Sequence, residues 1–449
     1  MQNTQQAVSN AARVLSLAML CFFVIPLVTS VTMEAGLSDA SAQQDKDKKK
    51  QKTRKVPAIR ANIFKKLEKA QELAEAKQFA EATEVLDSFD VVNRRDRYND
   101  FERAQIWNFY AFIYSSKEDY KSALQAYLNV LKEKQIPEGL EVGTLFTVAQ
   151  LYFIQENYRK VISTMKVWFS KTQSPNPNSY IIMAQAYYQL KEYRNGIPEV
   201  KKAMALAREK GRPMKENWYL LLRVMHYELN EYPQVRDILE ILVRDFPKRE
   251  YWLQLAGMYA ELKQEKKQFG AMEAAHAQGL LKRESELLNM AQLYLYHETP
   301  IKGARILQKG MKDEVIKRDK KNLKLLAQSL RMAQEHEDAI PVLAEAAKVS
   351  NEGELYFQLG QSYFELDKYN DCVDSIETGQ KLGGIKRPDT ANIMKGMCLF
   401  NLDRLSPAIA AFREAAKQDK RSRKMGNRWI SFLTKERERR RQLRQSLGQ

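Results

Sequence analysis

The chain has 449 residues, of which 44% are hydrophobic and 29% charged, a composition typical of a folded protein and too apolar for general disorder. With only 18 Gly and 13 Pro along the whole length, helix-breaking residues are scarce. Three cysteines exclude a disulfide framework as the main source of stability, and a formal net charge of +17 favours anionic partners or surfaces.

Residues 1–42 have the layout of an export signal. Arg13 precedes an apolar stretch at residues 14–28, and Ala40-Ser41-Ala42 supplies a small-residue cleavage site. The apolar stretch is shorter than the roughly 20 residues that a membrane-spanning helix needs. We therefore expect a cleaved signal peptide, with an uncleaved membrane anchor as the alternative. Export of the remainder makes nucleic acid a poor partner for its positive charge.

Residues 43–60 are polar and Lys-rich, and we expect them to form a disordered tether. A recurring pattern of large and small residues then covers residues 61–420. In one unit, Trp107 is followed by the small residue Ala111 and by Tyr114, and a second helical pattern opens with Tyr120 and Ala123. Small residues at two of these positions let the two helices cross closely, and the aromatic residues fill the space between units.

The small residue of the first helical pattern marks each unit. It recurs at intervals of 33 to 41 residues, at Ala70, Ala111, Ala149, Ala184, Arg223, Ala256, Ala291, Ala327, Gly360 and Gly396. The fifth unit departs from the pattern, with Arg223 at the small position and His226 at the aromatic one. We interpret it as a genuine repeat with locally altered packing.

This pattern resembles the tetratricopeptide repeat (TPR), a helix–turn–helix unit of about 34 residues. The resemblance implies an all-α fold, a right-handed α-solenoid of about ten TPR-type repeats over residues 61–420. Residues 421–449 would supply a C-terminal capping helix, built on Trp429, Ile430, Phe432 and Leu433, and a basic tail. For the tail at residues 435–444, a solvated face is the favoured interpretation, and contact with an anionic membrane surface, the cell wall or an acidic partner is the alternative.

Residues that could carry chemistry are sparse. The four histidines fall in four different repeats, without the spacing of a metal site, and no glycine-rich phosphate loop follows a strand. We therefore expect no metal, no cofactor and no enzymatic activity. Cys372 and Cys398 fall in helical patterns, where buried thiols are the favoured interpretation and a disulfide between neighbouring repeats is the alternative.

The TPR resemblance also implies where partners bind. In that family the first helices line a concave groove, and contacts come from the residue after the small one and from the position three further along. The partner-binding residues implied here are Gln150, Phe153, Gln185, Tyr188, Tyr227, Gln292, Gln328, Gln361, Phe364 and Phe400. An amide donates and accepts hydrogen bonds, which suits an extended peptide, and aromatic rings add contact area. For any single glutamine, bonding within or between helices is the favoured alternative.

One subfamily of TPR proteins grips peptide C-termini with paired lysines and asparagines. Lys321 and Lys324 come nearest to that arrangement, but Gln328 replaces the asparagine. We therefore do not expect this mode of recognition.

Four stretches, at residues 52–60, 102–110, 137–140 and 216–222, resemble a narrower group. They are similar to periplasmic TPR proteins found alongside the TonB–ExbB–ExbD energy-transduction machinery of gammaproteobacteria. The resemblance implies a non-catalytic periplasmic scaffold that mediates protein–protein interaction as an accessory of TonB-dependent nutrient uptake, with TonB, ExbB or ExbD as partners. The alternative is an envelope-assembly or cell-wall factor that binds outer-membrane proteins or peptidoglycan enzymes.

Overall fold

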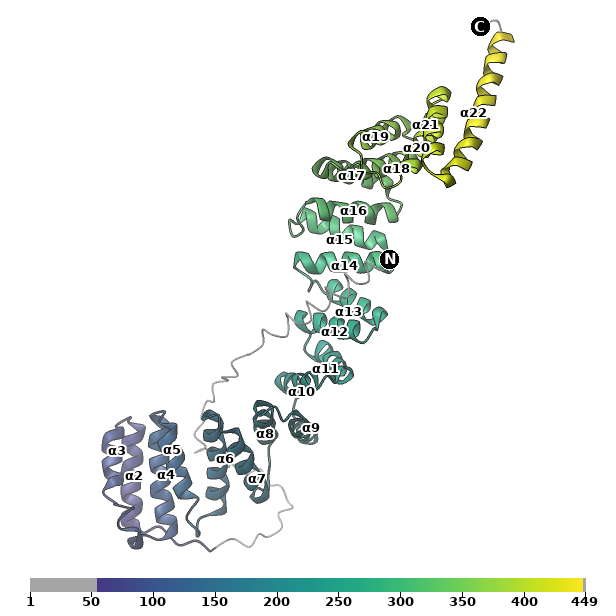
Figure 1. Cartoon of the computed structure of the whole chain (residues 1–449). Coiled ribbons are helices and arrows are strands. Elements are labelled where there is room, and N and C mark those ends of the chain that lie inside the picture. Colours follow the sequence, from purple (N-terminus) through teal and green to yellow (C-terminus); the bar gives the residue numbers. More distant parts are fainter. Residues whose placement is uncertain (1–54, 447–449) are drawn as a thin grey trace. The chain divides into compact units, whose positions relative to one another are not determined.

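The computed structural model describes residues 55–446, which contain 21 α-helices and one short 3-10 helix (Figure 1). The predicted signal peptide at residues 1–42, and the alternative anchor, lie outside the described residues, as does most of the predicted tether. No helix among residues 55–446 combines the length and the apolarity needed to cross a membrane.

The chain divides into two compact units, and the boundary falls in the sequence between Gln264 and Glu265. The first unit holds α2 (Ala61–Glu75), α3 (Phe79–Asp87), η1 (Arg95–Arg97), α4 (Asp100–Ser116), α5 (Tyr120–Val130), α6 (Glu138–Ile154), α7 (Tyr158–Lys171), α8 (Pro177–Gln189), α9 (Tyr193–Glu209), α10 (Glu216–Glu228), α11 (Tyr232–Asp245) and α12 (Arg249–Glu261). The second unit holds α13 (Glu265–Ala277), α14 (Glu284–Tyr296), α15 (Pro300–Lys312), α16 (Lys320–Met332), α17 (His336–Ser350), α18 (Gly353–Glu365), α19 (Tyr369–Leu382), α20 (Pro388–Asn401), α21 (Leu405–Gln418) and α22 (Lys420–Ser446).

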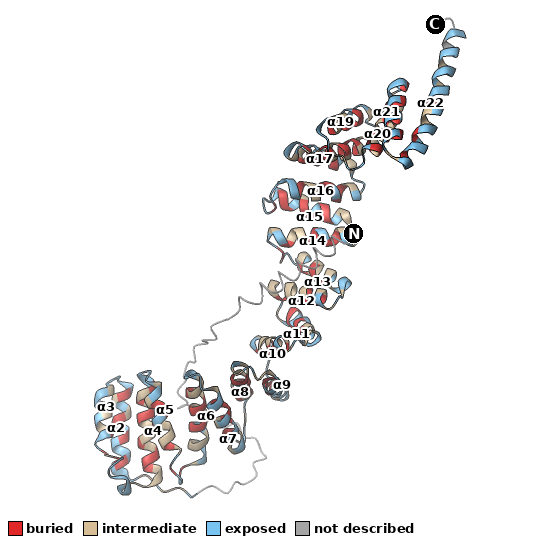
Figure 2. Cartoon of the chain, in the orientation of Figure 1, coloured by how far each residue is buried: buried red, intermediate tan, exposed pale blue. Residues whose placement is uncertain are grey.

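Within each unit, consecutive helices pack in pairs, and each pair packs on the next (Figure 1). The even-numbered helix of a pair is the first helix of a repeat, and first helices of neighbouring repeats also meet, as α2 meets α4, α8 meets α10 and α18 meets α20. This tandem helix–turn–helix packing confirms the predicted all-α, TPR-like solenoid class. Because each pair contacts its neighbours, the apolar core runs through each unit as a series of linked clusters (Figure 2).

Each first helix ends in the same tight turn, and the described residues contain ten such turns. In every one, a residue other than glycine adopts the left-handed conformation, with φ between 56° and 62°. The following N–H donates to the carbonyl five residues earlier at 2.8–2.9 Å, the hydrogen bond of a Schellman motif. The ten left-handed residues are Lys77, Glu118, Glu156, Lys191, Asn230, Lys263, Glu298, Gln334, Asp367 and Asp403.

The small residues lie where the two helices of a repeat touch. Ala111, Ala149 and Ala184 are fully buried, and at Gly360 a Cβ atom would lie 2.8 Å from the Ile376 side chain. The helix pair therefore leaves no room for a larger side chain there. In the fifth repeat Arg223 occupies this position, and its guanidinium donates to Gln254 of the next repeat. The predicted local change in packing is thus a side chain that reaches across to the neighbouring first helix.

The interpretation of Cys372 and Cys398 as separate buried thiols was wrong. The two residues form a disulfide that joins α19 to α20, and both are fully buried. Because these helices belong to consecutive repeats and pack together, their Cα atoms lie 6.5 Å apart, which is within reach of a disulfide.

The predicted capping segment and the basic tail form one helix, α22. It packs on α21 and also contacts α20, as the first helix of a further repeat would. Leu433 is fully buried in this contact, and the Trp429 ring stacks on Phe412 with centroids 5.3 Å apart. Helix α22 therefore covers the apolar end of the last repeat.

Candidate partner-binding surface

The ten residues predicted to bind partners are divided between the two units. Gln150, Phe153, Gln185, Tyr188 and Tyr227 lie on α6, α8 and α10 of the first unit. The other five lie on α14, α16, α18 and α20 of the second unit; they are Gln292, Gln328, Gln361, Phe364 and Phe400. All ten are at least partly exposed, with Gln292 and Gln328 the most open to solvent among the glutamines. The structure therefore presents two candidate first-helix faces, one in each unit.

The predicted aromatic residues share one packing role. Phe153 meets Tyr158 edge to face with centroids 5.3 Å apart, and Phe364 meets Tyr369 in the same way at 5.9 Å. Tyr188 and Tyr227 contact Tyr193 and Tyr232 respectively, again five residues later. In each case the ring on the first helix packs across the turn against the ring of the first residue of the second helix.

Phe400 also packs against aromatic rings, but these belong to another repeat position and not to the helix that follows its own turn. Its ring contacts Trp429 and Phe432 of α22, with centroids 5.4 Å and 6.0 Å away. All five predicted aromatics therefore hold neighbouring helices together with one edge and leave another edge partly exposed. A partner would meet rings that are already oriented, at little cost in side-chain entropy.

The predicted glutamines differ in what their amides do. Gln361 accepts a hydrogen bond from Arg331 of the preceding first helix at 2.7 Å, so bonding between helices accounts for this residue. The Gln328 amide donates to the Met332 sulfur at 3.8 Å, which is its one hydrogen bond with a described residue. Among the described residues, none makes a hydrogen bond with the amides of Gln150, Gln185 or Gln292. These three amides keep their donors and acceptors available for a peptide or for water.

Sequence reasoning missed the arginines that bridge neighbouring first helices. Arg223 donates to Gln254, and Arg331 donates to Gln361, so in both cases an amide of the next repeat receives a guanidinium. Burial lowers the pKa of both guanidinium groups, although Tyr251 opposes the shift for Arg223. The buried Nε atom of each arginine makes no hydrogen bond to a described residue. Arg223 stood out in the sequence because it replaced a small residue, whereas Arg331 had no such signal.

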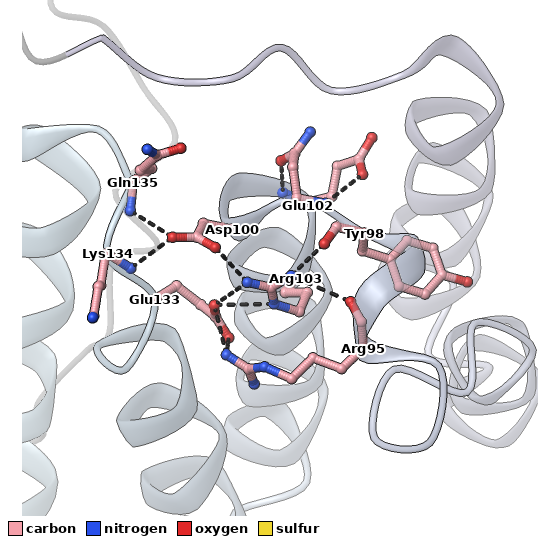
Figure 3. A network of polar contacts seen from close by, with 9 residues as sticks. Arg95, Tyr98, Asp100, Glu102, Arg103, Glu133, Lys134 and Gln135 are labelled. Atoms are coloured by element: carbon pink, nitrogen blue, oxygen red, sulfur yellow. Dashed lines mark hydrogen bonds and ion pairs between the residues drawn. The ribbon is translucent and has the colours of Figure 1, made fainter.

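A partly buried polar network lies at the start of α4 (Figure 3). Glu102 accepts hydrogen bonds from the Arg60 side chain at 2.7 and 2.8 Å and from the Arg60 backbone N–H at 3.0 Å. Burial raises the pKa of this carboxyl, but the hydrogen bonds from Arg60 and Asn99 outweigh it and leave the pKa below its usual value. Arg60 falls within the predicted tether, so the end of that segment is fastened to the second repeat.

The other half of the network is built on Arg103. Its guanidinium donates to Glu133 at 2.7 and 3.0 Å, and Arg95 pairs with the same carboxylate at 2.9 Å (Figure 3). The Asp100 carboxylate pairs with Arg103. It also accepts hydrogen bonds from the backbone N–H groups of Lys134 at 3.1 Å and Gln135 at 3.0 Å. Clusters of buried charges with shifted pKa values often mark active sites. Here each carboxylate is engaged by cations or N–H groups of the protein itself, so the network fixes three segments in place.

The lysines compared with the peptide C-terminus clamp line an open hollow at the start of α16. Asp319, Lys320, Lys321 and Lys324 form its walls. Glu352 pairs with Lys320 and with Lys324, both at 2.5 Å. Glu352 therefore already engages Lys324, one of the two lysines that were compared with the clamp. Within residues 55–446, no group of three or more His, Cys, Asp or Glu residues is arranged to hold a metal ion.

No protein-family model and no curated protein matches this chain. Among solved structures, the chain is similar to a TPR protein from Parabacteroides merdae, with 14% identity over 60% of this chain and 98% of that one and a TM-score of 0.34. It is similar to the TPR2AB domain of yeast Sti1 in complex with pHSP90, with 12% identity over 59% and 99% and a TM-score of 0.33. It is also similar to YrrB, a TPR protein with an unusual peptide-binding site, with 12% identity over 42% and 89% and a TM-score of 0.32. Because the sequence identities and the TM-scores are this low, these similarities add no evidence beyond the fold that the helix pairs define.

Proposed function

We propose that this protein is a non-catalytic periplasmic scaffold that binds other proteins through its first-helix faces. The observation that carries the proposal is the open amides at Gln150 and Gln185 in the first unit and at Gln292 in the second, each one residue beyond a buried alanine and flanked by half-buried apolar side chains. Tandem helix pairs build extended surfaces of this kind, and partners bind along them. An amide pairs with a peptide backbone as donor and acceptor at once.

The disulfide between Cys372 and Cys398 supports an exported location. Disulfides persist in oxidising compartments such as the periplasm and are rare in the reducing cytosol. The export signal predicted at residues 1–42 points to the same compartment.

The partner we propose is a component of the TonB–ExbB–ExbD machinery, which would make the protein an accessory of outer-membrane nutrient uptake. The support is the resemblance of stretches such as residues 102–110 and 216–222 to periplasmic TPR proteins that accompany this machinery. An envelope-assembly role, with outer-membrane or peptidoglycan-enzyme partners, is the second candidate, because open amides would also hold an unfolded precursor.

Site-specific photo-crosslinking in cells distinguishes these functions. Crosslinkers would replace Gln150, Gln185 and Gln292, one at a time, in the full-length chain. The matched controls are Lys166, Lys201 and Arg305, which are exposed on the second helices α7, α9 and α15. We expect TonB, ExbB or ExbD to be captured from the glutamine positions and not from the controls.

Other outcomes would each remove part of the proposal. Capture of outer-membrane precursors or wall enzymes at the glutamine positions would contradict the transport role and leave the scaffold role standing. Equal capture at both sets of positions, or none at the glutamines, would contradict binding through the first-helix faces.

A further inference from the structure

Helix α22 concentrates the positive charge of the protein. Its 27 residues include 11 Lys or Arg and two Glu, so it carries more than half of the net charge of the whole chain. Most residues of the helix are exposed to solvent, as the pale blue colour of its ribbon in Figure 2 shows. Capping the last repeat needs only the buried side around Leu433 and therefore does not account for this charge.

Three large apolar side chains also lie exposed on α22. Met425, Phe432 and Leu443 are 50%, 51% and 52% exposed. Successive residues of an α-helix are rotated by about 100°, which places the three side chains within about 20° of a single line along the helix. Exposed apolar residues scattered singly need no explanation, but three aligned over five turns form an apolar edge.

A row of cations borders this apolar edge on its solvent side. Arg421, Arg428, Lys435 and Arg439 lie between about 40° and 80° from the line by the same helical rotation. On its other side the edge adjoins the face that packs on α20 and α21. Glu436 lies close to the line, but Arg439 and Arg440 pair with it at 2.8 and 2.7 Å.

We propose that α22 lies flat on an anionic lipid bilayer, with Met425, Phe432 and Leu443 entering the headgroup region and the cation row contacting lipid phosphates. Helices that bind membrane interfaces combine these two features, an apolar edge and flanking Lys or Arg. An acidic protein would match the charge but would not require an aligned apolar edge. A second copy of this chain would be repelled by its own cation row.

The binding involves only this helix and lipid, so it is independent of any protein partner. The test uses the chain from Gln43 onward, which keeps every described residue and removes the apolar stretch at residues 14–28. Its binding to vesicles of phosphatidylcholine with 30% phosphatidylglycerol, and of phosphatidylcholine alone, is measured by flotation at low and high salt. We expect binding to the anionic vesicles only, and weaker binding at high salt.

Two variants separate the contributions of charge and apolar surface. In R421Q/R428Q/K435Q, which removes cations that make no side-chain ion pair with a described residue, we expect on the order of a hundredfold weaker binding. In M425Q/L443Q we expect about tenfold weaker binding, because two apolar side chains no longer leave water. The matched control K282Q/K312Q/K348Q removes the same charge from exposed positions outside α22 and should bind as the unmodified chain does. Circular dichroism and the melting temperature verify that each variant is folded.

Three results would overturn the assignment. The first is absence of binding by the unmodified chain at low salt. The second is equal loss in the control and in R421Q/R428Q/K435Q, which would mean that total charge and not α22 is responsible. The third is undiminished binding by M425Q/L443Q together with equal binding to polyglutamate, which would identify α22 as a site for acidic proteins.

Discussion

Arg103 and Glu133 form a buried ion pair that joins the first turn of α4 to the turn after α5. The Arg103 Nη2 and Glu133 Oε2 atoms lie 2.7 Å apart, and the two residues are only 8% and 5% exposed. Both charges lie within the second repeat, so the pair holds the turn after α5 against the start of α4.

Replacing Glu133 by Ala should therefore destabilise the first unit. The change removes the more deeply buried of the two carboxylates that pair with Arg103, the other being Asp100, and we expect the free energy of unfolding to fall by about 3 kcal/mol. Urea denaturation followed by tryptophan fluorescence measures the change. The control is Glu414→Ala, which removes one partner of the exposed pair with Lys417 and should cost less than about 1 kcal/mol. Similar midpoints for the two variants would show that the buried pair contributes little.

Reducing the disulfide should destabilise the C-terminal repeats. A bond between Cys372 and Cys398 restricts the unfolded chain across 26 positions, so we expect its loss to cost about 3 kcal/mol. Denaturation with and without reductant measures this, and the variant C372A/C398A should not respond to reductant at all. In the unmodified chain from Gln43 onward, thiol titration under denaturing conditions should find no free thiol before reduction. Two free thiols at that stage would contradict the disulfide.

The left-handed turns predict that a glycine substitution is stabilising at one place and destabilising at another. Lys191 holds φ at 59°, which strains any residue with a Cβ atom. We expect Lys191→Gly to stabilise the protein by about 0.5 kcal/mol, the relief of strain being partly offset by a more flexible unfolded chain. In the middle of α9, Lys201→Gly should destabilise it by about 1 kcal/mol. Thermal denaturation compares the two, and effects of equal sign would refute the role of the turn.

Acid should release α22 from the last repeat. The Arg387 guanidinium, bonded to Asp389 at 2.6 Å, holds the pKa of that carboxyl far below its usual range, and the Ser422 hydroxyl of α22 acts in the same direction. Because the folded-state pKa lies below the unfolded value of about 4, this contribution is complete above that pH and is lost as the pH falls below it.

Hydrogen exchange of peptides from α22, corrected for intrinsic rates, should therefore show loss of protection between about pH 4 and pH 2. The variant Asp389→Asn should show weaker protection of α22 at neutral pH and a flatter dependence on acid. A profile for the variant that matches the unmodified chain would rule out Asp389 as the titrating group.

The repeat architecture could be predicted from the sequence because its determinants are local. A small residue such as Ala184 and the aromatic that follows three positions later recur with the helix period, so they specify helix pairs without knowledge of the fold. The five-residue spacing of Tyr188 and Tyr193, now seen as a ring contact across the turn, was also present in the sequence. Tyr188 alone of the two was predicted to bind partners, because a sequence position does not show which edge of a ring is covered.

Contacts between distant segments could not be predicted in this way. Arg103 and Glu133 are 30 positions apart, and Glu133 lies in a turn without periodicity. The same limit applies to Cys372 and Cys398, since a separation of 26 does not reveal that α19 and α20 bring their Cα atoms together. Whether the open amides at Gln150 and Gln185 bind a partner remains a prediction.

The disulfide also determines how the chain would extend under load. While it holds, a force applied to the two ends cannot straighten the 26 positions between Cys372 and Cys398. An extended residue spans about 3.5 Å, so about 90 Å of contour length is withheld from the pulled chain. Tension would pass through the sulfur–sulfur bond and bypass the loop between α19 and α20. The segment from Cys372 to Cys398 would therefore lengthen least when the protein is stretched.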